Sequence, residues 1–473
     1  MSTLLSTRVK RVGLSLGAVA AAVSLVVGVA IAATPFTDIN GNPHAADIDA
    51  TYNAGIVTGC DATRYCPSDP VKRDQLAGFL ARTAGLSTSA AKRFPVVNAR
   101  STAQTYCSLH AASPRSFDAG PCQGTAVDVD TAPTVGLHSS VAMGADGLPV
   151  MSYFDAKNGD LRVARCAQAA CTAGATIATV DAAGVVGRYS SIAIGADGLP
   201  LISYYDATNG DLKVAHCVNL ACAGNVTTST VDSAGDVGQF SALTIGADGI
   251  GVIAYFDATN GDLKVARCTA TACTVVTKAV LDAGGVVGQH ASIALGADNV
   301  PAIAYFDATR SRLKFTRCSD ASCKGGASTV TLDPTSIAGQ FSSIAVGIDG
   351  MPVIAYYDAG ATDLKVLRCG NTLCSIGITI VAVDISGDVG KFASIAIGTD
   401  GRPVVAAYRV DGANLRFARC LNAACSSSVV RTIDANGDVG SNASITVAPD
   451  GVPVVSYHDA GRGVLRVARP PAA

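Results

Sequence analysis

The sequence contains no tryptophan and no glutamate, so all 37 of its acidic residues are aspartate. Glutamate favours helices, whereas aspartate competes with the backbone for hydrogen bonds and favours turns and caps. Charged residues make up only 15% of the chain and the formal net charge is −2, so the sequence lacks the clustered excess of Lys and Arg that a nucleic-acid partner requires. With 49 glycines as well, the composition predicts strands joined by many tight turns.

Residues 1–32 have the pattern of an export signal. Three basic residues precede an apolar stretch over residues 12–30, and the small residues Ala30 and Ala32 then offer a cleavage site before Ala33. The stretch is also nearly long enough to span a bilayer, so a retained anchor is the alternative to a cleaved signal peptide. Both alternatives predict an extracytoplasmic protein, secreted or attached to the bacterial cell surface, that contacts the membrane only through this segment.

Six cysteines recur at intervals of 50 or 51 residues and expose a repeat: Cys166, Cys217, Cys268, Cys318, Cys369 and Cys420. In the unit 190–240, four strand-like runs lie at 191–195, 201–205, 212–217 and 227–231, separated by turns rich in Gly, Asp and Asn. The second run is small or apolar on both faces, and the third alternates with polar residues. A four-stranded unit that is buried near its inner edge and wetter near its outer edge is typical of a β-propeller blade.

The first strand of the repeat begins near seven positions: Ser140, Ser191, Ala242, Ser292, Ser343, Ser394 and Ser444. The last unit stops after its third strand, at 465–468. A matching fourth strand, 125–130, stands at the other end of the repeat array. If this strand pairs with the last unit, the ring closes without exposed sheet edges. The sequence therefore predicts an all-β, seven-bladed β-propeller over 125–470, closed by pairing of its N- and C-terminal strands.

The 16 cysteines, an even number, are expected to form disulfides rather than zinc sites. A zinc site needs a second pair nearby, but one pair per repeat would be spread around a ring. The seventh blade has Pro470 in place of a cysteine. The predicted disulfides are Cys60–Cys66, Cys107–Cys122, Cys166–Cys171, Cys217–Cys222, Cys268–Cys273, Cys318–Cys323, Cys369–Cys374 and Cys420–Cys425.

Residues 34–86 differ from the repeat and are joined to it by a linker over 87–124, which the Cys107–Cys122 disulfide would staple. The segment resembles one S-layer homology (SLH) unit. The resemblance rests on Phe36 and Asp38, on Gly55, Ile56 and Gly59, on Cys66-Pro67, and on Arg73 with Gln75 at the start of a second helical stretch. It implies a small helical N-terminal domain.

In the SLH family, three units commonly assemble to bind cell-wall polymers, and an Arg contacts the anionic glycan. The resemblance implies that Arg73 takes this role here, with Lys72 beside it in place of a Thr. Only one unit is present, so the segment is expected either to anchor the protein to cell-wall polysaccharide or to serve as a structural or partner-docking element.

The repeated Asp residues of the propeller are expected to be turn formers. Their oxygens allow a structural calcium site, but the spacing does not match an EF-hand-like loop, so neither a metal nor another cofactor is predicted. The Asp-box of sialidase-type propellers needs a Trp that is absent here. His138 and His290 align with aromatic residues of other blades and are expected to pack rather than to bind a ligand. The basic residues that recur on the third strands are expected to pair with Asp.

Departures from the repeat are the better indication of a site. The fourth blade carries Arg310 and Arg312 where others have Asn-Gly-Asp, and the sixth carries Arg409 where others have Asp. These three residues form a candidate anion- or glycan-facing patch; no catalytic residue is predicted.

The favoured function is a non-catalytic surface or scaffold protein that displays a propeller face to a cell-wall polysaccharide, a surface glycan or a protein. The alternative is a secreted hydrolase or lyase with a site at the mouth of the channel. Non-repeated polar side chains converging at the channel mouth would favour the enzyme, and seven near-equivalent turns would favour the binding protein.

Overall fold

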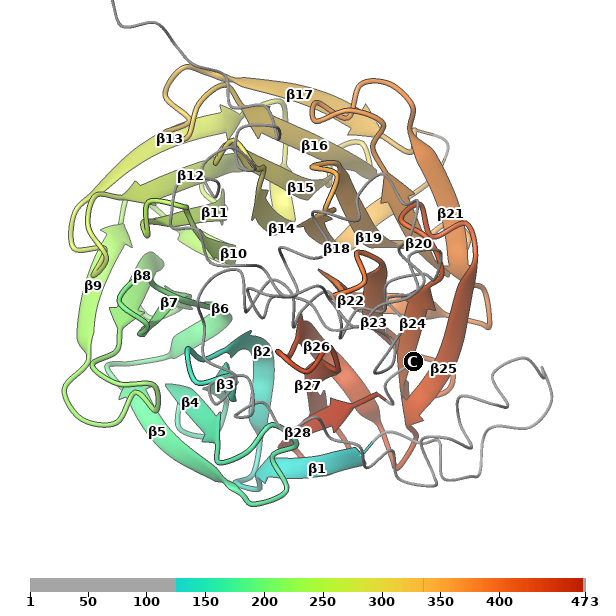
Figure 1. Ribbon diagram of the computed structural model, residues 1–473. Coiled ribbons are helices and arrows are strands. Elements are labelled where there is room, and N and C mark those ends of the chain that lie inside the picture. Colours follow the sequence, from blue (N-terminus) through green and yellow to red (C-terminus); the bar gives the residue numbers. More distant parts are fainter. Residues whose placement is uncertain (1–124, 335, 471–473) are drawn as a thin grey trace, which may run out of the picture. The chain divides into compact units, whose positions relative to one another are not determined.

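The computed structural model describes residues 125–470, apart from position 335. Seven four-stranded antiparallel sheets surround a central channel, which confirms the predicted all-β, seven-bladed propeller (Figure 1). The expected export signal (1–32), helical SLH-like unit (34–86) and linker (87–124) lie outside the described residues. The same holds for Lys72, Arg73 and the pairs Cys60–Cys66 and Cys107–Cys122.

Each blade is a simple up-and-down sheet whose first strand lines the channel. The innermost strands are β2 (Val135–Met143), β6 (Val186–Ile194), β10 (Val237–Ile245), β14 (Val287–Leu295), β18 (Ala338–Val346), β22 (Val389–Ile397) and β26 (Val439–Val447). The second strands are β3 (Pro149–Asp155), β7 (Pro200–Asp206), β11 (Gly251–Asp257), β15 (Pro301–Asp307), β19 (Pro352–Asp358), β23 (Pro403–Arg409) and β27 (Pro453–Asp459).

The third strands are β4 (Asp160–Cys166), β8 (Asp211–His216), β12 (Asp262–Cys268), β16 (Arg312–Cys318), β20 (Asp363–Arg368), β24 (Asn414–Cys420) and β28 (Val464–Arg469). The outermost strands are β5 (Ala175–Asp181), β9 (Thr227–Asp232), β13 (Val276–Asp282), β17 (Ala327–Leu332), β21 (Thr379–Asp384), β25 (Ser428–Asp434) and β1 (Thr125–Asp130). Blades one to six are numbered from β2–β5 to β22–β25.

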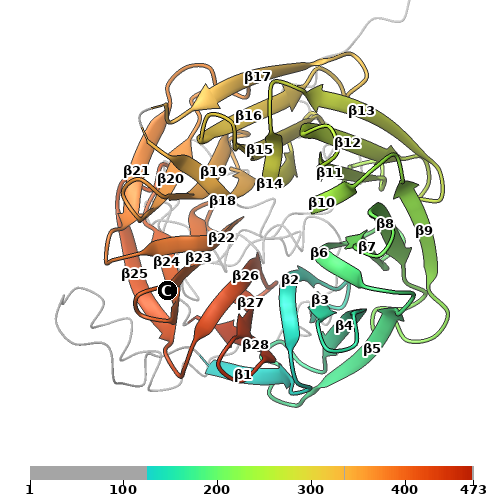
Figure 2. The same ribbon diagram turned by 180° about the vertical axis from the view of Figure 1, so that it is seen from behind.

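The seventh blade is closed as the repeat count predicts. Strand β1 pairs antiparallel with β28, so this blade combines the first described strand with the last three (Figures 1 and 2). Its sheet lacks the cysteine pair of the other blades, but Asp128 on β1 forms ion pairs with Arg462 and Arg466. The ring is therefore closed by backbone pairing and by charge.

The core lies between neighbouring blades rather than within one sheet. Every residue of the second strands is buried in six of the seven blades, whereas the outermost strands are mostly half-buried or exposed. Val214 of the second blade, for example, packs in one cluster with Ile253 of the third. Because both faces of each second strand are covered by other blades, these strands are small or apolar on both sides.

Most of the repeated basic residues of the third strands pair with Asp residues, as the sequence predicts. On each third strand, the later basic residue pairs with the Asp of the turn that joins the first and second strands. Six of these are ion pairs: Arg165–Asp146, Arg267–Asp248, Arg317–Asp298, Arg368–Asp349, Arg419–Asp400 and Arg469–Asp450. In the second blade, Nε2 of His216 lies 2.8 Å from Oδ2 of Asp197.

The earlier basic residue of each third strand reaches across to the Asp that ends the outermost strand of the preceding blade. In six of these places a buried Tyr from the second strand donates to the same carboxylate; Tyr255 and Lys264, for example, both bind Asp232. The sixth blade has Ala407 instead of this Tyr, so Arg416 reaches Asp384 there without a tyrosine beside it. We call this arrangement the interblade latch.

Six of the predicted disulfides are present, one in each of blades one to six, at the hairpin between the third and outermost strands. Such a number of disulfides indicates an oxidising, extracytoplasmic compartment. Within residues 125–470, no helix is long and apolar enough to cross a membrane.

Candidate active site at one mouth of the channel

The two faces of the propeller are built from different connections. The upper face, as we name it, carries the loops from second to third strands and from each outermost strand to the next blade. The lower face carries the turns between first and second strands and the disulfide hairpins.

Near the upper face, six inner strands each place one aromatic ring around the channel, and we call this ring the aromatic collar. Neighbouring ring centroids are 4.5–4.7 Å apart. The collar lines a cavity of about 180 Å³. Its members are His138, Tyr189, Phe240, His290, Phe341 and Phe392.

A repeated backbone irregularity positions the collar. The pairing of each inner strand with its second strand shifts register around the collar residue, as between Gln239 and Ala242. The collar residues have φ values of 51–53°, which is the left-handed region that side chains other than Gly rarely adopt. A β-bulge of this kind re-aims a side chain, and strained backbone of this kind is often found at functional sites.

The two collar histidines are neutral ring members. Burial lowers the pKa of His138 to about 4, with a smaller contribution from the nearby Arg188 guanidinium, and burial lowers the pKa of His290 to about 4 as well. Within the collar, His290 stacks between Phe240 and Phe341, and His138 stacks on Tyr189 alone. Both therefore take the aromatic position of the repeat, as the alignment predicts, and both also line the cavity.

The collar is interrupted in the seventh blade. Asn442 occupies the equivalent position with the same left-handed backbone, at φ 53°, and its Oδ1 accepts a hydrogen bond from the backbone N–H of His138 at 3.0 Å. Between Phe392 and His138 the aromatic wall is therefore replaced by one polar amide, and we call this position the collar gap.

Between neighbouring blades, the penultimate residue of one second strand lies opposite the residue that precedes the next inner strand. This pair is apolar at some blade junctions and polar at others. The penultimate residue of the second strand is Phe in blades one, three and four, where a Val or Ile precedes the next inner strand. It is Tyr in blades two, five and six, where an Asp precedes the next inner strand. The three resulting pairs are Tyr205–Asp236 at 2.7 Å, Tyr357–Asp388 at 2.7 Å and Tyr408–Asp438 at 2.6 Å.

These three carboxylates differ in what holds their second oxygen. Gln239 donates to Oδ2 of Asp236 at 3.1 Å, and Lys391 donates to Oδ2 of Asp388 at 3.3 Å. The residue equivalent to Gln239 and Lys391 is Ser441 in the seventh blade. Among the described residues, nothing hydrogen bonds to Oδ2 of Asp438, which therefore remains available to a ligand.

Tyr408 holds the other oxygen of Asp438 as a proton donor. Burial raises the pKa of Tyr408 to about 12, and its hydrogen bond to Asp438 acts in the same direction, so the phenol keeps its proton at neutral pH. Asp438 lies four residues before Asn442 on the chain, at the start of the strand that carries the collar gap. A free carboxylate oxygen and a break in an aromatic wall thus occur in the same blade.

His458 connects the last blade to the first and does not belong with the Tyr–Asp pairs. Its Nδ1 lies 2.8 Å from the backbone carbonyl oxygen of Val135, so the buried imidazole ties the seventh blade to the first. Burial lowers the pKa of His458 in spite of this hydrogen bond.

The predicted arginine patch lies on the upper face, but its members are not brought together. Arg310 is bound to Asp307 and to the Gly284 carbonyl, and Arg312 contacts the carbonyls of Ser311 and Ser336. Arg409, two blades away from them, holds Asp411 through two hydrogen bonds of 2.8 and 3.1 Å. The role of these residues in binding a ligand stays a prediction.

Sequence reasoning missed Tyr408 and the special status of Asp438. The sequence pattern that could have revealed them is the covariation of Tyr with an Asp 30 or 31 residues later, against Phe with Val or Ile. The free oxygen is not visible in the sequence, because it depends on which side chain covers each carboxylate.

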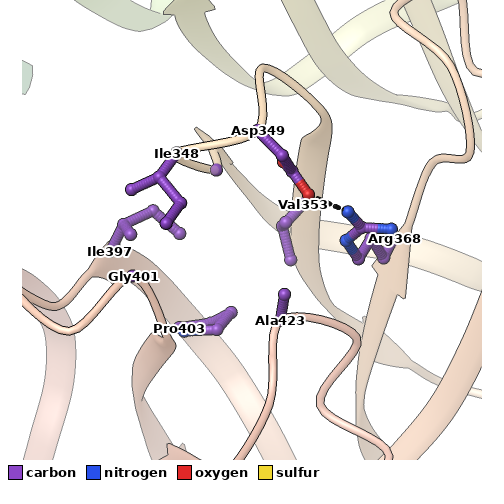
Figure 3. A pocket seen from close by; sticks show the side chains of 9 residues that line it. Ile348, Asp349, Val353, Arg368, Ile397, Gly401, Pro403 and Ala423 are labelled. Atoms are coloured by element: carbon purple, nitrogen blue, oxygen red, sulfur yellow. Dashed lines mark hydrogen bonds and ion pairs between the residues drawn. The ribbon is translucent and has the colours of Figure 1, made fainter. Parts of the chain in front are cut away.

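A second hollow lies on the lower face between blades five and six, where the Asp349–Arg368 ion pair closes one side (Figure 3). Its volume of about 10 Å³ holds at most one water molecule. No group of three or more His, Cys or Asp residues within 125–470 is arranged to hold a metal ion. The channel mouth is therefore the better candidate site.

No family model matches the sequence, and no curated protein is similar to it. Among solved structures, the chain is similar to a protein of unknown function from Dyadobacter fermentans, with 12% identity, 73% of this chain and 98% of that one covered, and a TM-score of 0.46. It is also similar to an ulvan lyase of polysaccharide lyase family PL25 (10% identity, 73% and 94% covered, TM-score 0.43). A third is a GH93 α-L-arabinofuranosidase from Fusarium graminearum (11% identity, 73% and 97% covered, TM-score 0.42).

The two structures with a stated activity are a glycoside hydrolase and a polysaccharide lyase. This finding contradicts the expectation of a non-catalytic binding or scaffold protein, and with it the expectation that the chain is not an enzyme. Both expectations are withdrawn. The alternative, a hydrolase or lyase with a site at the channel mouth, is developed below from the residues of this chain alone, because identities of 10–12% carry over no individual residues.

Proposed function

We propose that the protein is an extracytoplasmic enzyme that hydrolyses a glycan at the upper mouth of its channel. One observation carries the proposal: Oδ2 of Asp438 is free, Tyr408 fixes its other oxygen at 2.6 Å, and the carboxylate belongs to the blade that opens the aromatic collar. Asp438 does not itself line the cavity, but it directly precedes the strand whose Asn442 and Ala443 do. Of the three repeated Tyr–Asp pairs only this one leaves a carboxylate oxygen uncovered, and such a departure from the repeat distinguishes an enzyme site from equivalent turns.

Hydrolysis of a glycosidic bond commonly uses two carboxyl groups on opposite sides of the bond. Asp438 is proposed as the general base or nucleophile, because its Oδ2 can approach water or the anomeric carbon. Asp388, at the neighbouring blade junction, is the proposed second carboxyl group, and Tyr357 and Lys391 hold it in place. In its protonated form it would give its proton to the leaving-group oxygen as the glycosidic bond breaks, while the proton of the attacking water passes to Asp438. This chemistry needs water but no cofactor.

The aromatic collar suits a sugar substrate. Aromatic side chains offer a large apolar surface, and the polar edges of the site then orient a ligand. A cavity of about 180 Å³ is smaller than the roughly 300–1,000 Å³ of a site for a drug-sized ligand, so it takes a group no larger than one or two sugar rings.

The proposed location follows from the disulfides and from the expected export signal. The enzyme would be secreted or attached to the bacterial surface, with cell-wall polysaccharide or another surface glycan as its substrate. The SLH-like segment, through Arg73 and Lys72, would then hold the enzyme close to the wall.

The test uses the purified secreted protein and a panel of neutral and acidic polysaccharides, with release of reducing ends as the readout. D438N should lower kcat by about 100-fold or more, as expected for loss of a general base or nucleophile. D236N is the matched control, because Asp236 is held by a Tyr in the same way but both of its oxygens are occupied.

The control should keep wild-type activity within about threefold. Equal loss in D236N and D438N, full activity in D438N, or no cleavage of any polysaccharide would contradict the proposal. An unsaturated product, formed without incorporation of a water molecule, would show that the enzyme cleaves by elimination and is a lyase instead of a hydrolase.

A further inference from the structure

The residue that precedes each collar position on the inner strand varies in a way that marks one blade. It is Gln in blades three, four and five, as Gln239, Gln289 and Gln340. It is a cation in only two blades, as Arg188 in the second and Lys391 in the sixth. Lys391 is bound to Asp388, whereas Arg188 has no hydrogen bond or ion pair within the described residues.

Arg188 is held in place without being neutralised. Its guanidinium carbon lies 5.5 Å from the centroid of the Phe154 ring, a cation–π contact that leaves the N–H groups free to bind a ligand. The side chain is exposed, and its charge is felt at the collar, because it contributes to the lowered pKa of His138.

Arg188 and Asp438 lie on either side of the collar gap. Asp438 precedes the strand of Asn442; Asn442 contacts the backbone of His138; and the His138 ring stacks at 4.6 Å on Tyr189, the neighbour of Arg188. Around the ring of inner strands, the positions of Arg188 and Asp438 are therefore separated by Asn442 and His138.

We propose that Arg188 determines specificity for an acidic glycan by binding the carboxylate or sulfate of a sugar that lies over the His138 side of the collar gap. This inference rests on the proposed function, since the same bound chain presents its glycosidic bond to Asp438. A guanidinium matches a planar carboxylate or a sulfate with two parallel hydrogen bonds, and a free one beside an aromatic cavity selects for anionic groups.

Three other cations at the mouth are already paired with carboxylates, whereas Lys157, in the loop after β3, is exposed and has no ion pair among the described residues. Arg310 and Arg409 are each bound to an Asp, and Lys391 is bound to Asp388. An anionic sugar placed at Arg188 also keeps its charge away from Asp438, which would repel it at close range.

The experiment replaces Arg188 by Gln, the residue that three other blades carry at this position, so R188Q is expected to fold. Oligogalacturonides (carboxylate), sulfated carrageenan fragments (sulfate) and neutral xylo-oligosaccharides serve as probes. Binding is measured by titration calorimetry on D438N and on R188Q/D438N, and turnover of the same probes is measured on the wild type and R188Q.

R188Q should weaken binding of at least one acidic probe by about 10- to 100-fold, as expected for loss of charge-assisted hydrogen bonds, and should leave neutral probes unchanged. In turnover, R188Q should raise KM with little change in kcat. R188K keeps the positive charge but loses the paired N–H donors of the guanidinium, so its affinity for acidic probes should lie between those of the wild-type residue and R188Q. The acidic probe that responds identifies carboxylate or sulfate as the recognised group.

Unchanged affinity in R188Q/D438N, an equal loss for neutral probes, or no binding of acidic probes to D438N would overturn the inference. Failure of the proposed function has a different signature. In that case, acidic probes bind in an Arg188-dependent way but the wild type cleaves none of them.

Discussion

Replacing Tyr255 by Phe removes one hydroxyl group from the interblade latch and leaves the buried ring in place. This hydroxyl donates to Oδ2 of Asp232 at 2.7 Å, and Asp232 also accepts hydrogen bonds from Lys264 at 2.6 Å and Lys278 at 2.7 Å. A hydrogen bond to a charged group contributes about 1.5–3 kcal/mol. Because two ammonium groups remain on Asp232, we expect Y255F to lower the free energy of unfolding by about 1.5 kcal/mol, the lower end of that range.

Y457F should cost more, about 3 kcal/mol, because a single cation, Arg466, remains on Asp434. Tyr189 is the matched control, since its hydroxyl group has no hydrogen bond within residues 125–470, and Y189F should lie within about 0.5 kcal/mol of the wild type. Urea unfolding followed by circular dichroism measures all three. Equal midpoints for Y255F and Y189F would refute the view that the latch stabilises the ring of blades.

Three further predictions concern stability at low pH, the contribution of one disulfide and the arginine patch. Burial alone would raise the pKa of Asp232, but hydrogen bonds from Lys264, Lys278 and Tyr255 outweigh it and lower the pKa to about 2. The stability that this group contributes should therefore be complete above about pH 4 and be lost as the pH falls toward 2, a trend that D232N should flatten in unfolding curves. Replacing both members of the Cys369–Cys374 disulfide by Ser should lower the free energy of unfolding by about 2 kcal/mol, because the disulfide no longer restricts a short loop of the unfolded chain. An unchanged urea-unfolding midpoint would contradict this prediction. The arginine patch expected from the sequence and the Arg188 proposal predict different results. If Arg310, Arg312 and Arg409 bind the polymer, replacing all three by Gln should abolish co-sedimentation with polysaccharide. If Arg188 binds it, the same triple variant should co-sediment as the wild type does.

The repeat made the fold accessible from the sequence. The cysteine period exposed the repeat, and the seven recurring first strands predicted the number of blades. The strand at 125–130 predicted the closure, because it supplies the fourth strand that the last unit lacks. The paired charges on the third strands followed from the same regularity.

The site could not be found in this way, because it consists of small departures whose meaning depends on contacts between blades. Asp438 resembles Asp236 and Asp388 in the sequence, and only the structure shows that Ser441 leaves one oxygen of Asp438 uncovered. Arg409, in contrast, stands out in the sequence but is bound to Asp411 within its own loop.

Arg188 was overlooked for a similar reason. It stands among the equivalent Gln residues of other blades, and the sequence does not tell whether an arginine is paired. Its importance depends on the position of the Phe154 ring beneath it and on the absence of a carboxylate partner among the described residues. Regular repeats therefore predict the scaffold well and the exceptions poorly.

The most direct test of the account is a crystal structure of D438N with an oligosaccharide that the wild type cleaves. The account predicts a sugar residue in the collar gap between Phe392 and His138, with its glycosidic oxygen close to residue 438. A sugar bound only on the lower face, or on the outer strands away from the channel, would contradict it.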